Sequence, residues 1–199
     1  MPSLAADLFL QAKMLAELEG GRPKQASLRR SISTAYYGLF HFLIQESTSL
    51  IVGTGPAEEK NRQLVGRAFV HGKMKSLCQE FTRTQPTEIL QPFFRSANAA
   101  SLASIANVAQ TFIDLQGERH SADYDLAVRF SRTAALNSWQ RAHDAVAEWN
   151  RLLVADREFC RFFALTKPEF LAKSVWEKII EISPSVTNPS RDIFNSSPA

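Results

Sequence analysis

A chain of 199 residues, of which 45% are hydrophobic and 22% are charged, is long enough to bury one substantial core and has the composition of a globular protein. Its net charge of +3 is spread without a basic run, so nucleic-acid binding is allowed but not indicated. No apolar stretch approaches the roughly 20 residues that cross a bilayer. The Met-Pro-Ser start lacks a charged signal region, so we expect a cytoplasmic protein without membrane contact.

Apolar residues recur at three- and four-residue spacing, which predicts an all-α, up-and-down bundle of four to five long helices. Caps and glycines place the expected ends: Ser3 to Gly20, Pro23 to Gly53, Glu58 to Phe81, Asn98 or Ser101 to Gly117, a short helix from Ser121 or Asp123 to Arg129, and a long one from Ser131 or Thr133 past Leu153. Between Thr82 and Ser96, two prolines and apolar pairs predict an ordered, non-helical loop held by its own side chains.

The chain divides into a bundle over residues 1–165, a C-terminal helical appendage over 166–182, and a flexible tail over 183–199 that is rich in Ser, Pro and Asn. Cys78 and Cys160 have no second Cys or His at ligand spacing, which indicates reduced thiols and neither a zinc site nor a disulfide. Motifs of P-loops, zinc proteases, serine elbows and EF-hands are absent, so we expect no metal and no cofactor.

Two histidines lie within predicted helices that face the core. Arg67 and His71 stand four apart, a spacing at which they could share one surface and handle a phosphate. A packed, hydrogen-bonded His71 is the favoured alternative, because this residue also falls on an apolar stripe. His41 ends an aromatic segment that contains Tyr36 and Tyr37, and the simplest interpretation of that segment is core with a polar edge.

Residues 118–125 concentrate five ionisable side chains and a tyrosine at what looks like a helix start. A helix N-terminus favours anions, and Arg119 and His120 beside it could hold a phosphate. Asp123 or Asp125 would then cap the helix or orient Arg119. In the equally weighted alternative, the two aspartates only cap the helix and pair with Arg119.

The segments 28–41 (LRRSISTAYYGLFH) and 119–124 (RHSADY) resemble the HEPN superfamily of helical bundles, whose name stands for higher eukaryotes and prokaryotes nucleotide-binding. The resemblance rests on an aromatic "AYY..FH" helix followed much later by an "R..ADY" element, and it covers about Leu8 to Leu165. It implies a bundle of four or five helices, usually dimeric. Many members are metal-independent ribonucleases of toxin–antitoxin and defence systems, whereas others bind nucleotides or are non-catalytic modules.

Catalytic members carry an Arg and a His separated by about four to six residues, because a base must deprotonate the 2′-hydroxyl while a cation stabilises the phosphorane. Here Arg67 and His71 have three residues between them, and Arg119 and His120 have none. Thr34 also stands where related small proteins have an Arg before the tyrosines. Residues that match the resemblance and would bind a ligand are Arg119, Asp123 and Tyr124, with Tyr36, Tyr37 and His41 on the facing helix.

Three hypotheses follow. The preferred one is a homodimer that binds RNA or a nucleotide through Arg119, His120 and the aromatic helix without efficient cleavage. The second is a protein-interaction module that uses its aromatic surfaces and C-terminal helix to bind a protein partner. The third is a metal-independent endoribonuclease in which Arg119 and His120 are the phosphate clamp and the base, converging from a loop as adjacent side chains on a helix cannot.

Overall fold

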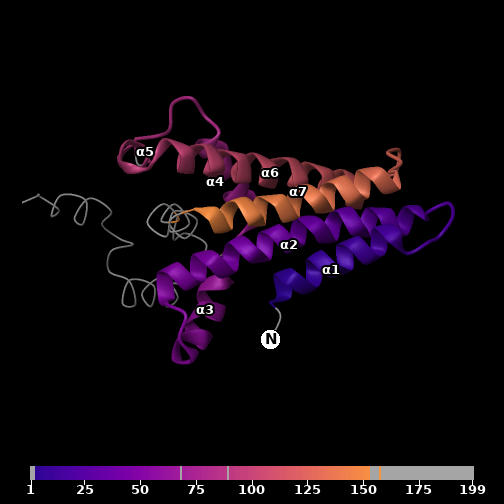
Figure 1. Cartoon of the computed structure of the whole chain (residues 1–199), viewed down its shortest axis with the longest axis horizontal. Coiled ribbons are helices and arrows are strands. Elements are labelled where there is room, and N and C mark those ends of the chain that lie inside the picture. The colour runs from indigo at the N-terminus through magenta and orange to yellow at the C-terminus, as the bar shows by residue number, and fades with distance from the viewer. Residues whose placement is uncertain (1–2, 68, 89, 153–156, 158–199) are drawn as a thin grey trace, which may run out of the picture.

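The computed structural model describes residues 3–67, 69–88, 90–152 and 157, and every regular element in these residues is a helix, which confirms the all-α class. In chain order they are α1 (Leu4–Glu17), α2 (Gln25–Val52), the 3-10 turn η1 (Pro56–Glu58), α3 (Glu59–Gly66), α4 (His71–Phe81), α5 (Gln91–Ser96), α6 (Ala99–Tyr124) and α7 (Arg132–Arg151). The long helices α1, α2, α6 and α7 lie side by side (Figure 1). Among the described helices, none combines the length and apolar character needed to span a membrane.

Helix α2 is the centre of the bundle, because α1, α3, α6 and α7 all pack against it. Every residue from Ser31 to Tyr36 is therefore buried, with no polar side facing water. A buried hydroxyl needs a partner, and Ser31 Oγ donates to the carbonyl of Ala12 in α1 at 2.7 Å. Between Ser31 and Leu43, the partly exposed side chains are those of Tyr37, His41 and Phe42. Tyr37, His41 and Phe42 are thus available at the surface of an otherwise enclosed segment of α2.

Three predicted helix starts are confirmed by side-chain caps. Ser3 Oγ accepts from Ala6 N at 3.3 Å at the start of α1. The Asn98 side chain caps α6 and the Ser131 side chain caps α7 in the same way. Each cap satisfies a backbone N–H that the first helical turn leaves without a partner.

The single helix expected from Glu58 to Phe81 is wrong. The chain forms η1, α3 and α4 there, with a break after Gly66 at which Val70 is extended. A side chain at Gly66 would approach Ile44 of α2 to 3.4 Å, so α3 ends in close contact with α2. The buried Phe69 then anchors the turn between the two helices. Arg67 and His71 consequently sit on different helices and do not share a helical face.

The loop expected between Thr82 and Ser96 contains one helix, α5, so its non-helical prediction is wrong for residues 91–96. The prediction that its own side chains hold it is confirmed. Phe81 of α4 stacks on Phe94 with ring centroids 5.5 Å apart and meets Phe93 edge-on at 5.9 Å. Leu90 is only 1% exposed. These contacts stabilise the segment by burying apolar area.

The expected stop at Gly117 and the short helix starting at Ser121 or Asp123 are also wrong. Helix α6 continues through Gly117 to Tyr124, and residues 125–131 are not helical. A glycine inside a helix costs about 1 kcal/mol, and the buried Leu115 and Ala122 on either side of it offset this cost by packing. Helix α7 ends at Arg151, before the expected limit. The predicted appendage at 166–182 and tail at 183–199 lie outside the described residues.

One face of α1 is apolar and exposed. Ala5, Phe9, Ala12 and Ala16 are buried against the bundle. Opposite them, the exposed large side chains are Leu4, Leu10, Met14 and Leu18, with exposed fractions from 57% to 64%. This face, the α1 apolar face, is the largest group of exposed apolar residues on any one described helix.

Candidate functional site

The guanidinium of Arg119 is the centre of a cluster formed by the C-terminal end of α6 and the middle of α2. Its Nη2 donates to the hydroxyl of Tyr37 at 3.0 Å. Its carbon lies 5.6 Å from the ring centroid of Tyr37 and 5.6 Å from that of Tyr124. The Arg119 side chain is 22% exposed, so solvent and ligands can reach it.

Asp123 pairs with this arginine one helical turn later. Its Oδ2 lies 2.8 Å from Arg119 Nε and accepts a hydrogen bond from Ser33 Oγ of α2 at 3.3 Å. This close contact is an ion pair without a hydrogen bond, because the Nε–H of Arg119 is not aligned with the carboxylate oxygen. The carboxylate therefore orients the guanidinium, although the Nε–H of Arg119 has no hydrogen-bond acceptor.

His71, the first residue of α4, completes the cluster from a third helix. Its ring stacks on Phe40 with centroids 3.9 Å apart and meets Tyr37 edge-on at 5.6 Å. Its Nδ1 lies 2.7 Å from the hydroxyl of Tyr36, a residue with no solvent exposure. The sequence favours a packed, hydrogen-bonded His71 over a phosphate-handling one, and these contacts confirm that His71 is packed and hydrogen-bonded.

Burial sets the protonation of this pair. It lowers the pKa of His71, and the charges of Arg119 and His41 lower it further, so the imidazole is neutral at neutral pH. Burial likewise raises the pKa of Tyr36, whose hydroxyl keeps its proton. Because a buried hydroxyl proton needs an acceptor, Tyr36 donates to His71 Nδ1. The remaining proton of His71 is then on Nε2, which makes this atom a donor and not a base.

A pH dependence of stability follows from the same burial. Burial lowers the folded-state pKa of both His71 and His41 below the ordinary value of about 6.5. Below that value the unfolded chain binds more protons than the folded chain, so the free energy of unfolding should fall as the pH drops, and above it the contribution is complete. Urea midpoints measured from about pH 7.5 to 5.5 should decrease for the native chain and decrease less for His71→Gln. Equal pH dependence in the two proteins would contradict the assignment.

The other predicted site residues lie at the edge of the cluster or away from it. His120 is exposed and lies against Tyr124, with ring centroids 5.1 Å apart. His41 is half-buried and meets Phe40 edge-on at 5.4 Å. Arg67 is exposed at the end of α3, and its side chain makes no hydrogen bond or ion pair with any residue that the structure describes.

The predicted placement of Arg119 and His120 at a helix start, or on a loop, is wrong, because both lie in the last two turns of α6. The C-terminal end of a helix carries partial negative charge, so this end attracts cations and does not help to hold an anion. Adjacent residues on a helix point about 100° apart, so Arg119 and His120 cannot converge on one phosphate as they could from a loop.

Three residues of the site are not among those predicted from the sequence: Ser33, Phe40 and Arg29. Ser33 and Phe40 lie one helical turn from Tyr37 and Tyr36 on α2, a spacing that could have suggested them. Arg29 donates to the carbonyls of Ala122 and Asp125 at 2.9 Å each, and also to those of Ser121 and Val128. It thereby fixes the end of α6 that carries Asp123 and Tyr124, although no local pattern relates it to that end.

Comparison of the chain with protein-family models, with curated proteins and with solved structures found no match in any of the three.

The described residues contain no group of three or more His, Cys, Asp or Glu side chains that could hold a metal ion. Cys78 is buried and free, and burial raises the pKa of its thiol, as expected for a reduced core cysteine. The chemistry that this site offers is therefore one fixed cation, several N–H donors and accessible aromatic rings.

Proposed function

We propose that this chain is a HEPN-like protein that binds RNA or a nucleotide at the Arg119 cluster without efficient cleavage. The observation that carries the proposal is the guanidinium of Arg119 lying 5.6 Å from two tyrosine ring centroids in an accessible site. A phosphate needs a fixed cation and a nucleobase needs an aromatic face for stacking. Tyr124, which is 64% exposed, offers such a face beside the cation.

Two further observations support phosphate binding at this place. The Arg119 side chain is 22% exposed, so the outer part of its guanidinium can donate to a phosphate oxygen. His71 stands at the N-terminus of α4, where backbone N–H groups favour anions, and its Nε2 proton adds a donor. Arg119 and His71 come from different helices, and both contact Tyr37.

Binding is favoured over cleavage because the cluster lacks an evident base. Removal of the 2′-hydroxyl proton requires a base near the cation, and the Asp123 carboxylate there is already paired with Arg119 and Ser33. The Nδ1 of His71 accepts from Tyr36, and His120 diverges from Arg119 along α6. A homodimer, and a role in a toxin–antitoxin or defence system, belong to the same proposal and rest on the resemblance of residues 28–41 and 119–124 to the superfamily.

Arg119→Ala is expected to weaken binding of a mixed RNA pool by about tenfold, which corresponds to about 1.4 kcal/mol. The loss of one phosphate contact should also make the dependence of log affinity on log salt shallower by roughly 0.7. Fluorescence anisotropy at several salt concentrations measures both quantities, and light scattering gives the mass of the assembly. Arg83→Ala is the matched control, since Arg83 is also paired within one turn, with Glu80, but lies outside the cluster.

Incubation of the same RNA with and without EDTA separates the alternatives. Cleavage that resists EDTA and is lost in Arg119→Ala would replace the binding proposal with a metal-independent ribonuclease. If Arg119→Ala unfolds the protein by circular dichroism, the arginine is structural and the site fails. Absence of both binding and cleavage would favour the protein-interaction module, for which the α1 apolar face is the supporting observation.

A further inference from the structure

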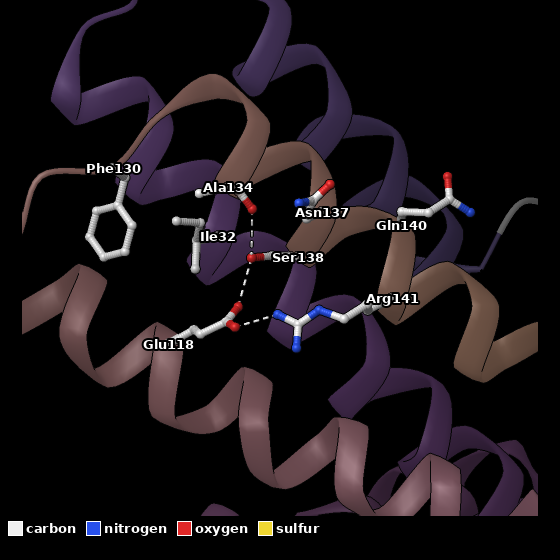
Figure 2. A pocket seen from close by; sticks show the side chains of 8 residues that line it. All are labelled: Ile32, Glu118, Phe130, Ala134, Asn137, Ser138, Gln140 and Arg141. Carbon is white, nitrogen blue, oxygen red and sulfur yellow. Dashed lines mark hydrogen bonds and ion pairs between the residues drawn. The ribbon is translucent and has the colours of Figure 1, made fainter.

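A separate pocket of about 460 Å³ lies between α6 and α7, with Ile32 of α2 on its lining (Figure 2). Phe130 and Ala134 add apolar surface, and Glu118, Ser138 and Arg141 supply the polar side. Glu118 directly precedes Arg119 in the sequence, but adjacent helical side chains point about 100° apart. The pocket therefore faces α7 and is distinct from the Arg119 cluster.

The apolar wall is fixed without any ligand. The backbone N–H of Phe130 donates to Gln25 Oε1 at 2.9 Å, and Gln25 Nε2 donates to the carbonyl of Phe130 at 2.8 Å. The guanidinium of Arg29 lies 5.4 Å from the Phe130 ring centroid. Because these contacts hold the ring in place, a ligand would not have to order the wall on binding.

The polar side has capacity for one more hydrogen-bond donor. Glu118 Oε2 accepts from Ser138 Oγ at 2.7 Å, and Glu118 Oε1 pairs with Arg141. A carboxylate has about four acceptor positions, so lone pairs remain on Glu118 after these two contacts. Asp114 Oδ2 also lies 4.0 Å from Arg141 Nη1. Two carboxylates thus share the one guanidinium of Arg141, of which Glu118 lines the pocket.

We propose that this pocket binds a small primary amine with an apolar body. The ammonium group would donate to Glu118, and the apolar body would cover Ile32, Phe130 and Ala134. The volume falls within the range of about 300–1,000 Å³ that is typical of small-molecule sites. At this polar end the Glu118 carboxylate can accept from an ammonium group, whereas it repels an anion placed at the same point.

Benzylamine is a suitable probe, with benzyl alcohol and phenylacetate as neutral and anionic analogues of similar size. Titration followed by amide chemical shifts should give a dissociation constant on the order of 1 mM for benzylamine, as expected for a ligand of this size. Shifts should centre on Phe130, Ala134 and Ser138. Phenylacetate should bind at least tenfold more weakly. Equal binding of phenylacetate, or shifts that centre elsewhere, would overturn the proposal.

Two variants test the assignment of the charge and of the apolar wall. Glu118→Gln keeps an acceptor for Arg141 and should weaken benzylamine about tenfold, whereas Glu148→Gln, on α7 outside the pocket, should not. Ala134→Leu fills the pocket from a partly exposed position and should abolish binding of benzylamine and benzyl alcohol alike. Unchanged benzylamine affinity in Glu118→Gln, or in a folded Ala134→Leu, would refute the site.

Discussion

Replacement of Arg29 with methionine is expected to lower the free energy of unfolding by about 3 kcal/mol. The guanidinium donates to four backbone carbonyls at and after the end of α6, and it places a cation where the helix dipole is negative. Methionine keeps the aliphatic length but leaves these carbonyls to solvent or without a partner. Urea unfolding followed by circular dichroism measures the change.

Arg132→Met is the matched control for this prediction. Arg132 donates to the carbonyls of Glu19 and Gly21 at the end of α1, so it makes the same kind of contact away from the Arg119 cluster. Both variants should be less stable than the native chain, and Arg132→Met the less affected. Only Arg29→Met should also weaken RNA binding, because Asp123 and Tyr124 lie on the turn that Arg29 holds. Equal binding losses in the two variants would show that Arg29 acts through stability alone.

Gly38→Val is expected to destabilise the bundle by about 3 kcal/mol, because α1 crosses α2 at this residue. A Cβ at position 38 would lie 2.7 Å from Cε1 and 2.8 Å from Cδ1 of Phe9, which is closer than van der Waals contact allows. The ring of Phe9 is itself buried, so it has little room to move. Thermal and urea unfolding of the purified variant would give the change.

The opposite sign is expected for a glycine in open space. Apart from the adjoining backbone of α6 itself, no atom lies within 4 Å of a Cβ built at Gly117, so Gly117→Ala should stabilise the chain by up to about 1 kcal/mol through helix propensity alone. Phe9→Leu should reduce the cost of Gly38→Val, and a double-mutant cycle measures that coupling. Additive effects of Phe9→Leu and Gly38→Val would mean that the ring is not the obstacle.

Features of the fold that depend on neighbours in sequence could be predicted. Ser3 is recognisable as a cap, and Asn98 and Ser131 are each one of two candidates, because a capping side chain acts within three residues of itself. The central helix was recognised from the spacing of its apolar residues. Gly117 is wrongly predicted to end a helix, because the packing of α6 against α2, α4 and α7 outweighs the local cost of a glycine. Such packing leaves no signal in the local sequence pattern.

The site was predictable in part. The resemblance places Arg119, Asp123 and Tyr124 opposite Tyr36, Tyr37 and His41. In the structure, Arg119 contacts Asp123, Tyr124 and, of the three facing residues, Tyr37. His71 was associated with the wrong partner, Arg67, because both were assigned to one helix. Its contacts with Phe40 and Tyr36 join α4 to α2 across the fold, and only tertiary structure reveals such contacts.

The hydrogen bonds that Arg29 makes at and after the end of α6 all go to main-chain oxygens. Main-chain oxygens are the same whatever side chain a residue carries. Substitutions at Leu126, which is 87% exposed, should therefore leave the hydrogen bonds of Arg29 intact. Chains that share this architecture are therefore expected to vary freely at 126 and to retain the arginine at 29. A reporter group attached at 126 would sit beside Tyr124 without disturbing the arginine that positions it.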